Sequence, residues 1–225
     1  MIILIMALFA ILAFWTNMTI KKSGMRYAVT LVMFAGLILS VIMIVANMHD
    51  HYGMTSVTTT TKKEIYSAGP NEQNFGMLLY QPVGTNGKEN AYIYKAAIQN
   101  KKTTVAKPDL NTTTRQVDIS GNKAYKVTKT TRFVYKLNGF KVLFGIAGND
   151  GQIKHRQVTY QVPPTWVALT TEQAKSLTVK LAPKNAAEKT MAAQQQKQLS
   201  DLAKSNPDQA ARLTVNQVKK VLQLD

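Results

Sequence analysis

MIILIMALFAILAFW (residues 1–15) and AVTLVMFAGLILSVIMIVA (residues 28–46) are the two stretches that decide the fold class of this chain. The first contains no charged, amide or hydroxyl side chain, and in the second only Thr30 and Ser40 interrupt the apolar run. A bilayer core about 30 Å thick is crossed by roughly 20 residues of helix. We therefore expect a membrane protein that begins with a two-helix transmembrane hairpin over residues 1–48, with spans at about 1–20 and 27–47.

Two other interpretations of these stretches are weaker. In a soluble protein, two successive helices that are apolar on every face would both have to be buried in a core. A cleaved signal peptide carries basic residues ahead of its apolar stretch, whereas no Lys or Arg precedes Ile2. A lipoprotein signal requires a Cys, which the chain lacks. We interpret the first stretch as a retained helix.

The basic residues near the spans predict their direction. Lys21, Lys22 and Arg26 lie between the spans, and the next basic residue after the second span is Lys62. Cytoplasmic loops concentrate Lys and Arg. We expect a multi-pass protein of the cell membrane with the connecting loop in the cytoplasm, both termini outside, and the large domain extracytoplasmic.

The part of the chain after the spans is strongly basic. Three of the 28 basic and one of the 12 acidic residues precede residue 52, which leaves 25 basic and 11 acidic residues beyond it. Such a surface attracts anionic polymers or lipid headgroups, although a generic solubility charge is the alternative. The absence of Cys suits a secreted domain of a Gram-positive bacterium. Besides the lipid bilayer, we expect anionic wall polymers such as teichoic acids, anionic lipids or another membrane protein as partners, and no nucleic acid.

Residues 52–182 predict an extracytoplasmic, mainly antiparallel β domain, because Thr, Val, Tyr, Ile and Phe alternate with polar residues. The expected early strands are 57–67, 77–81, 91–95 and 112–119. The clearest pattern runs over 125–137 and 140–146, which are joined by Asn138-Gly139, the strongest two-residue hairpin signal. With a further strand at 152–161, these would form a three-strand meander with one apolar and one basic face.

Residues 183–225 predict a helical tail rich in Ala, Gln and Lys. Pro163-Pro164 would end the sheet region, and the capping-box pattern Thr170-Thr171-Glu172-Gln173 predicts a helix start. Residues 185–204 are good helix formers with few large apolar side chains, and Asn206-Pro207 places a cap and an N1 proline before a last helix. The tail could pack on the sheet, bind a partner or stay mobile, and the weak apolar stripe favours mobility over 185–204.

Local stretches around the second span carry a resemblance to a known family. His49-Asp50-His51-Tyr52-Gly53-Met54 follows the span, and LLYQPVGTNGKE (residues 78–89) leads into Tyr92-Ile93-Tyr94-Lys95. Together they resemble an uncharacterised family of two-span membrane proteins of lactic-acid bacteria, known only as a domain of unknown function. The resemblance extends over roughly residues 1–160. It implies the topology and the host class, and it brings no activity, cofactor or catalytic residue.

One group of residues has the chemistry of metal ligands. His49, Asp50 and His51 are adjacent, and on an extended segment the two imidazoles would point to the same side. A zinc site needs three or four protein ligands, and the remaining histidine, His155, lies far along the chain. We therefore expect a polar collar where the helix leaves the bilayer rather than a metal site.

The basic side chains of the predicted meander form a second candidate site. Lys126, Arg132, Lys136, Lys141 and Lys154 would gather on one exposed side and bind an anionic polymer; a solvated sheet face is the alternative. No nucleophile elbow, catalytic Cys or paired carboxylate pattern occurs, and the glycine-rich residues 145–151 lack the order of a nucleotide loop. We expect no enzyme activity and no cofactor.

The leading hypothesis is an uncharacterised, membrane-anchored protein of the cell envelope, with a non-enzymatic binding or accessory role for its basic domain. The alternatives are an envelope enzyme with an unrecognised active site, and a scaffold that acts through the helical tail. A deep pocket with buried polar residues would favour the enzyme, whereas a shallow basic or apolar surface would favour binding.

Overall fold

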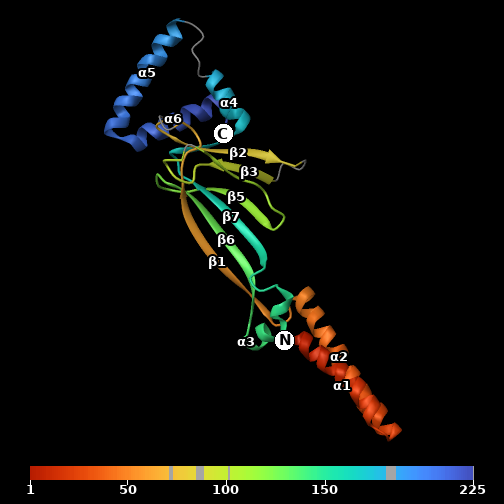
Figure 1. The fold of residues 1–225 in the computed structure, drawn as a ribbon. Coiled ribbons are helices and arrows are strands. Elements are labelled where there is room, and N and C mark those ends of the chain that lie inside the picture. The colour runs from red at the N-terminus through yellow and green to blue at the C-terminus, as the bar shows by residue number, and fades with distance from the viewer. Residues whose placement is uncertain (71–72, 85–88, 101, 181–185, 225) are drawn as a thin grey trace. The chain divides into compact units, whose positions relative to one another are not determined.

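The structure is a computed structural model that describes residues 1–70, 73–84, 89–100, 102–180 and 186–224 (Figure 1). The chain divides into two compact units, Met1–Thr59 with Thr130–His155, and Thr60–Lys129 with Arg156–Asp225. The elements are, in order, α1 (Ile2–Thr19), α2 (Ser23–Asp50), β1 (Met54–Ile65), β2 (Gly76–Val83), β3 (Glu89–Tyr94), β4 (Thr104–Ala106), β5 (Thr112–Asp118), β6 (Ala124–Tyr135), α3 (Asn138–Phe144), the 3-10 helix η1 (Gly145–Ala147), β7 (Ile153–Val162), β8 (Trp166–Thr170), α4 (Thr171–Lys180), α5 (Ala186–Ser205) and α6 (Pro207–Leu222).

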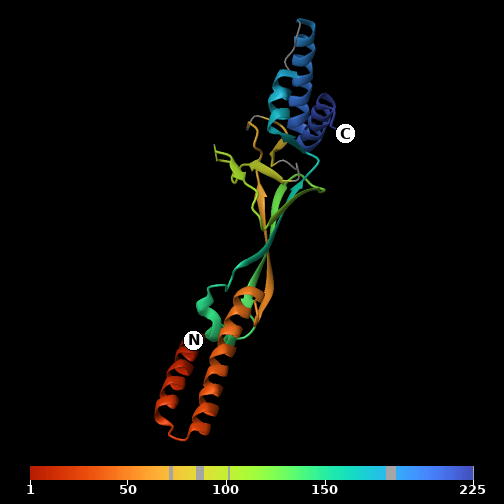
Figure 2. The ribbon, with the colours of Figure 1, turned by 90° about the vertical axis from the view of Figure 1, so that its right-hand side faces the viewer.

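The first unit contains a pair of apolar helices, α1 and α2, which lie side by side (Figure 2). Both are long and apolar enough to cross a membrane, by length and composition. Only 11% and 6% of their most apolar 18-residue windows are buried, whereas a core helix of a soluble protein would be mostly buried. The two backbones approach closely where Gly36 faces Phe9, because a Cβ at residue 36 would lie 2.6 Å from the phenyl ring.

The strands form two four-stranded sheets, with the orders β1-β6-β7-β5 and β4-β3-β2-β8. β2 pairs antiparallel with β3, and β3 with β4, but β2 runs parallel to β8, and β5 runs parallel to β7. The expectation of a mainly antiparallel domain is therefore replaced by a mixed, sheet-rich domain. Strands occur near each of the early positions expected from the sequence, whereas the strand β8 that follows Pro163-Pro164 shows that these prolines do not end the sheet region.

The sheet β4-β3-β2-β8, which belongs to the second unit, contacts a hydrophobic core on each of its two faces. On one face, Leu78, Tyr92 and Tyr94 join a core with Val158 and Tyr160 of β7. On the other face, a second core consists of Met77, Val167, Leu169, Leu177, Val215 and Val218, which β2, β8, α4 and α6 supply. Because successive strand residues point to opposite faces, a strand between two cores must be apolar throughout, as the run Met77-Leu78-Leu79 is.

The connection between β6 and β7 is helical, so the expected hairpin at Asn138-Gly139 and the strand over 140–146 are wrong. Residues Asn138–Phe144 form α3 and Gly145–Ala147 form η1. Phe144 is fully buried, and the Phe140 ring stacks on it with a centroid distance of 6.2 Å. Helical packing of these aromatic rings outweighs the turn propensity of one Asn-Gly pair, because each buried aromatic ring contributes several kcal/mol, on the order of 2–3.

Two helix starts in the C-terminal part are as the sequence predicted. In the capping box, the Thr170 hydroxyl accepts from the Gln173 amide at 3.0 Å, and the Gln173 side chain accepts from the Thr170 amide at 2.8 Å. Asn206 caps α6 through a bond from the Gln209 amide at 3.1 Å. Of the three alternatives for the tail, packing on the sheet applies to α6, since Val215 and Val218 are buried against β2 and β8. The predicted boundary between the β domain and the tail, at residues 182 and 183, lies outside the described residues.

Candidate functional site

The predicted metal residues at the end of α2 point to different neighbours. The His49 imidazole lies 2.8 Å from the carboxylate of Asp50, and both side chains are exposed. His51 ends α2 in the left-handed conformation, with φ of 55°, and its ring stacks on Phe133 at 3.7 Å. Over the part of the chain that the structure describes, no three His, Cys, Asp or Glu side chains lie together in a way that could hold a metal ion.

Next to these histidines, three side chains form a buried polar joint of the first unit, Asn47, Tyr135 and Asn149. The Asn149 amide donates to the Asn47 side-chain oxygen at 3.1 Å and to its backbone carbonyl at 3.0 Å. The Tyr135 hydroxyl donates to the Asn149 side-chain oxygen at 2.7 Å. Burial raises the pKa of Tyr135, and the nearby Asp150 carboxylate raises it further, so the phenol stays a donor at neutral pH. The joint fixes the end of α2 to the residues around β6.

The five basic residues predicted as a polymer site have different surroundings. Lys126 belongs to the second unit and is half-buried, where it donates to the Tyr94 hydroxyl at 2.9 Å. The prediction that Lys126 lies on an exposed face of the sheet is wrong, because Ala124, two residues earlier on the same face, is buried in the core.

The other four residues belong to the first unit. Arg132 donates to the Gly151 carbonyl at 2.8 Å, Lys141 pairs with Asp150 at 3.0 Å, and the ammonium of Lys154 lies 5.2 Å from the centre of the Phe133 ring. The side chain of Lys136 is exposed. Several of these cations therefore already have local partners, and they share one unit without Lys126.

A hollow of about 460 Å³ in the second unit is the place where an enzyme site would be sought. Its lining includes Glu64, Lys95 and Lys123. Glu64 and Lys123 pair with each other at 3.2 Å, and Lys95 donates to the Gly69 carbonyl at 3.1 Å. These contacts join neighbouring strands and loops.

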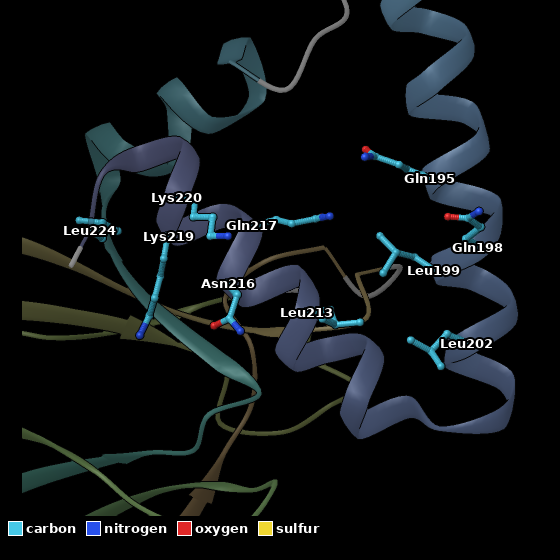
Figure 3. A pocket seen from close by; sticks show the side chains of 10 residues that line it. All are labelled: Gln195, Gln198, Leu199, Leu202, Leu213, Asn216, Gln217, Lys219, Lys220 and Leu224. Carbon is cyan, nitrogen blue, oxygen red and sulfur yellow. The ribbon is translucent and has the colours of Figure 1, made fainter.

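A second hollow is a groove of about 770 Å³ between α5 and α6, called the helix groove below (Figure 3). Its lining residues are Gln195, Gln198, Leu199, Leu202, Leu213, Asn216, Gln217, Lys219, Lys220 and Leu224. Figure 3 shows the side chains of Leu199 and Leu202 on α5 extending toward α6, and that of Leu213 on α6 extending toward α5. Leucines thus form the apolar part of the groove, carboxamides line both walls, and two lysines stand at the α6 side.

The helix α5 leaves most of its surface unburied. Between residues 190 and 205, where its side chains are described, none is buried, and only Leu199, Leu202 and Ala203 are half-buried. The low apolar content of 185–204 predicted weak packing, but the sequence alone did not indicate a groove. Leu199 and Leu202 are spaced by three residues, which puts them on one face, and this was the one local signal.

A protein-family model matches residues 22–177 of the chain, under the description "Domain of unknown function (DUF4811)". The chain belongs to the DUF4811 family. No curated protein and no solved structure matches it. The matched region starts just before α2, covers both sheets and ends within α4. The resemblance noted from the sequence extended over roughly residues 1–160, so the two ranges differ at both ends. The helix groove lies outside the DUF4811 region, so the family gives no role for it.

Proposed function

We propose that this chain is a membrane-anchored binding protein without enzyme activity, whose helix groove holds a segment of another protein. The observation that carries the proposal is the open groove between α5 and α6, in which leucines remain half-exposed between rows of carboxamides. Helices that bury little surface of their own gain stability when a partner covers their apolar positions. The proposal joins the accessory role of the leading hypothesis with its alternative, a scaffold that acts through the helical tail.

The lining of the groove indicates the chemistry of the partner. Leu199, Leu202 and Leu213 suit aliphatic or aromatic side chains. The four Gln and Asn side chains can each donate and accept hydrogen bonds, as the polar groups of a polypeptide require. Lys219 and Lys220 are the charged groups among the described lining residues, which include no Asp or Glu, so we expect the complementary segment to carry a carboxylate.

The membrane anchor of this proposal consists of α1 and α2. The basic residues Lys21, Lys22 and Arg26 support a cytoplasmic loop and an extracytoplasmic β-rich domain. The resemblance described above, together with the absence of Cys, supports the cell envelope of a Gram-positive, lactic-acid host. Because the chain has no Cys, single Cys residues at Ser23 and at the exposed Leu110 can be labelled with a membrane-impermeant maleimide on intact cells. Labelling at 110 alone is expected, and labelling at 23 alone would invert the topology.

Site-specific photocrosslinking tests the groove. A photoreactive residue replaces Gln198 or Asn216, which line the groove, or Ala193, which is exposed and lies on the opposite face of α5 by helical geometry. We expect a discrete adduct from positions 198 and 216, with the crosslink mapping to an apolar, acid-bearing segment. Position 193 should give little adduct.

A second variant separates binding from folding in the same cells. Leu213 is partly exposed, so Leu213→Arg should leave the folded domain intact while it introduces a charge among the leucines of the groove. The adduct from position 198 should then be lost at unchanged protein level. Equal adducts from 193, 198 and 216, or an adduct insensitive to Leu213→Arg, would refute the groove as the binding site.

Binding of an anionic wall polymer is the second candidate, favoured by the excess of 25 basic over 11 acidic residues after residue 51. Arg132, Lys136 and Lys154 are exposed and lie in one unit. Electrostatic attraction weakens as salt rises, because the Debye length shrinks to about 8 Å at physiological ionic strength. Sedimentation of the protein with purified cell walls across a salt series should show salt-sensitive binding. A variant in which Arg132, Lys136 and Lys154 are all replaced by Gln should lose this binding. Failure to bind walls at low salt would remove this candidate.

A further inference from the structure

The connection between β6 and β7 exposes three large apolar side chains that do not pack in the core of the fold. Leu137, Val142 and Ile146 have exposed fractions of 66%, 57% and 61%. All three belong to residues 137–147, called the foot below, which comprise the end of the β6 connection, α3 and η1. A soluble surface rarely gathers three large aliphatic side chains within ten residues without a partner for them.

The foot is rigidly built. Phe144 is fully buried, and the Phe140 ring packs against Phe144 and, at 5.9 Å and nearly perpendicular, against Tyr52. Gly53 follows Tyr52 with φ of +78°, and a Cβ there would lie 2.8 Å from the Phe140 ring. The aromatic residues thus hold the foot from the inside, while its aliphatic residues face outward.

The position of the foot in the first unit explains the exposed residues. Phe9 of α1 faces Gly36 of α2, and α2 continues to Asp50, so the last turns of α2 extend past the N-terminal end of α1. The foot lies beside these turns (Figures 1 and 2): Asn149, just after it, bonds to Asn47, and the Met1 amino group donates to the Val142 carbonyl at 2.9 Å. If α2 crosses the bilayer over 27–47, the foot stands at the level where the span leaves the apolar core.

Basic side chains accompany the foot. Lys136 precedes it with an exposed side chain, and Lys141 lies within it, paired with Asp150 at 3.0 Å. Aliphatic side chains flanked by lysines are the pattern of segments that lie in a membrane interface, where the chains enter the acyl boundary and the ammonium groups reach phosphate.

We propose that the foot inserts Leu137, Val142 and Ile146 into the leaflet from which α2 emerges, and that Lys136 and Lys141 contact the anionic phosphates of phospholipid headgroups there. The inference rests on the proposed membrane anchor. The foot would then be a third point of attachment to the membrane, besides the two spans. Because the polar joint of Asn47 and Asn149 connects the foot region to α2, this attachment would fix the tilt of the first unit relative to the bilayer.

Lipid-borne quenchers test this on the full chain. Because the chain has no Cys, single Cys variants at Val142 and at Val105, an exposed valine of β4 in the second unit, can each carry an environment-sensitive fluorophore. A third label at Leu39 of α2 reports the anchor itself. The proteins are reconstituted in vesicles of phosphatidylcholine, alone or with phosphatidylglycerol, that contain shallow or deep spin-labelled lipid.

The expected result is strong quenching at Val142 by the shallow spin label and blue-shifted emission, with Val105 unquenched and Leu39 quenched by the deep label. Adding phosphatidylglycerol should increase quenching at Val142, and Lys136→Gln with Lys141→Gln should abolish that increase. Quenching at Leu39 without quenching at Val142 would overturn the foot and leave the anchor intact. Absence of quenching at Leu39 would instead overturn the anchor, and no response to phosphatidylglycerol would overturn the lysine contacts.

Discussion

Replacing Tyr160 by Phe should make this protein more stable, which is unusual for a change at a fully buried position. The Tyr160 ring stacks on Tyr92 at 4.2 Å and lies 5.8 Å from the ring of Tyr94. Its hydroxyl is buried and makes no hydrogen bond within the part of the chain that the structure describes. The variant Tyr160→Phe keeps the ring and its stacking and removes only this unpaired group.

The expected magnitude follows from the cost of desolvation. A buried hydroxyl without a partner costs about 1–3 kcal/mol, so Tyr160→Phe should raise the free energy of unfolding by roughly 1 kcal/mol or more. Tyr94→Phe is the matched control, because the Tyr94 hydroxyl accepts from Lys126 at 2.9 Å. Loss of that bond should lower the free energy of unfolding by about 1 kcal/mol.

Alkaline pH sharpens the comparison. Burial raises the pKa of Tyr160, and the neighbouring Tyr94 and Tyr92 raise it further. The unfolded chain releases this proton near pH 10, so above about pH 10 the native wild-type protein binds more protons than its unfolded state and loses stability as pH rises. Tyr160→Phe lacks this loss, and its advantage over the wild type should grow by up to about 1.4 kcal/mol per pH unit.

Urea unfolding of the full chain in detergent micelles measures these differences. Trp166 packs against the core that contains Tyr160, and Trp15→Phe leaves Trp166 as the remaining indole reporter. We expect the midpoint to rise for Tyr160→Phe and to fall for Tyr94→Phe. A lower midpoint for Tyr160→Phe would mean that its hydroxyl has a partner, and the reasoning would be refuted.

Three further substitutions test other parts of the fold by the same unfolding assay. Val218→Ala on α6 should lower the free energy of unfolding by about 1–3 kcal/mol, because Val218 is buried in the second core. Leu213→Ala, at a partly exposed position of the same helix, should change it by no more than about 0.5 kcal/mol, and equal effects would contradict the packing of α6. Asn149→Ala removes the hydrogen bonds of the Asn149 side chain to Asn47 and Tyr135 and leaves only the longer 3.5 Å bond between Tyr135 and Asn47. The variant should cost about 1–3 kcal/mol, with faster amide exchange at the end of α2; unchanged exchange would argue against the joint. Gly76→Ala should cost about 1–3 kcal/mol and shift the Trp166 emission, since the new methyl group would overlap the indole ring, and a wild-type midpoint would disprove that overlap.

Patterns that act within a few residues were sufficient to locate much of the secondary structure. Continuous apolar runs determined α1 and α2, and the capping residues Thr170 and Asn206 determined the starts of α4 and α6. These elements are predictable because the interactions that define them, helix hydrogen bonds and cap bonds, join residues close in sequence.

Pairings between distant segments were decided by tertiary structure alone. The parallel neighbours β2 and β8, and β5 and β7, are separated by long stretches of chain, and a strand pattern carries no information about its partner. The Asn138-Gly139 turn gave way to α3 because burial of Phe144 outweighs a local turn preference. The half-buried position of Lys126 likewise depends on Tyr94 of another sheet.

The candidate site was beyond the reach of the sequence for the same reason. The residues of the helix groove are mostly Gln, Asn and Lys, whose pattern along α5 resembles an ordinary solvated helix. They become a site only because α6 is held against β2 and β8 by Val215 and Val218, which leaves its other face turned toward α5. Composition thus determined that this chain has two apolar helices and a basic, sheet-rich domain, whereas the groove arises from packing among segments that are distant along the chain.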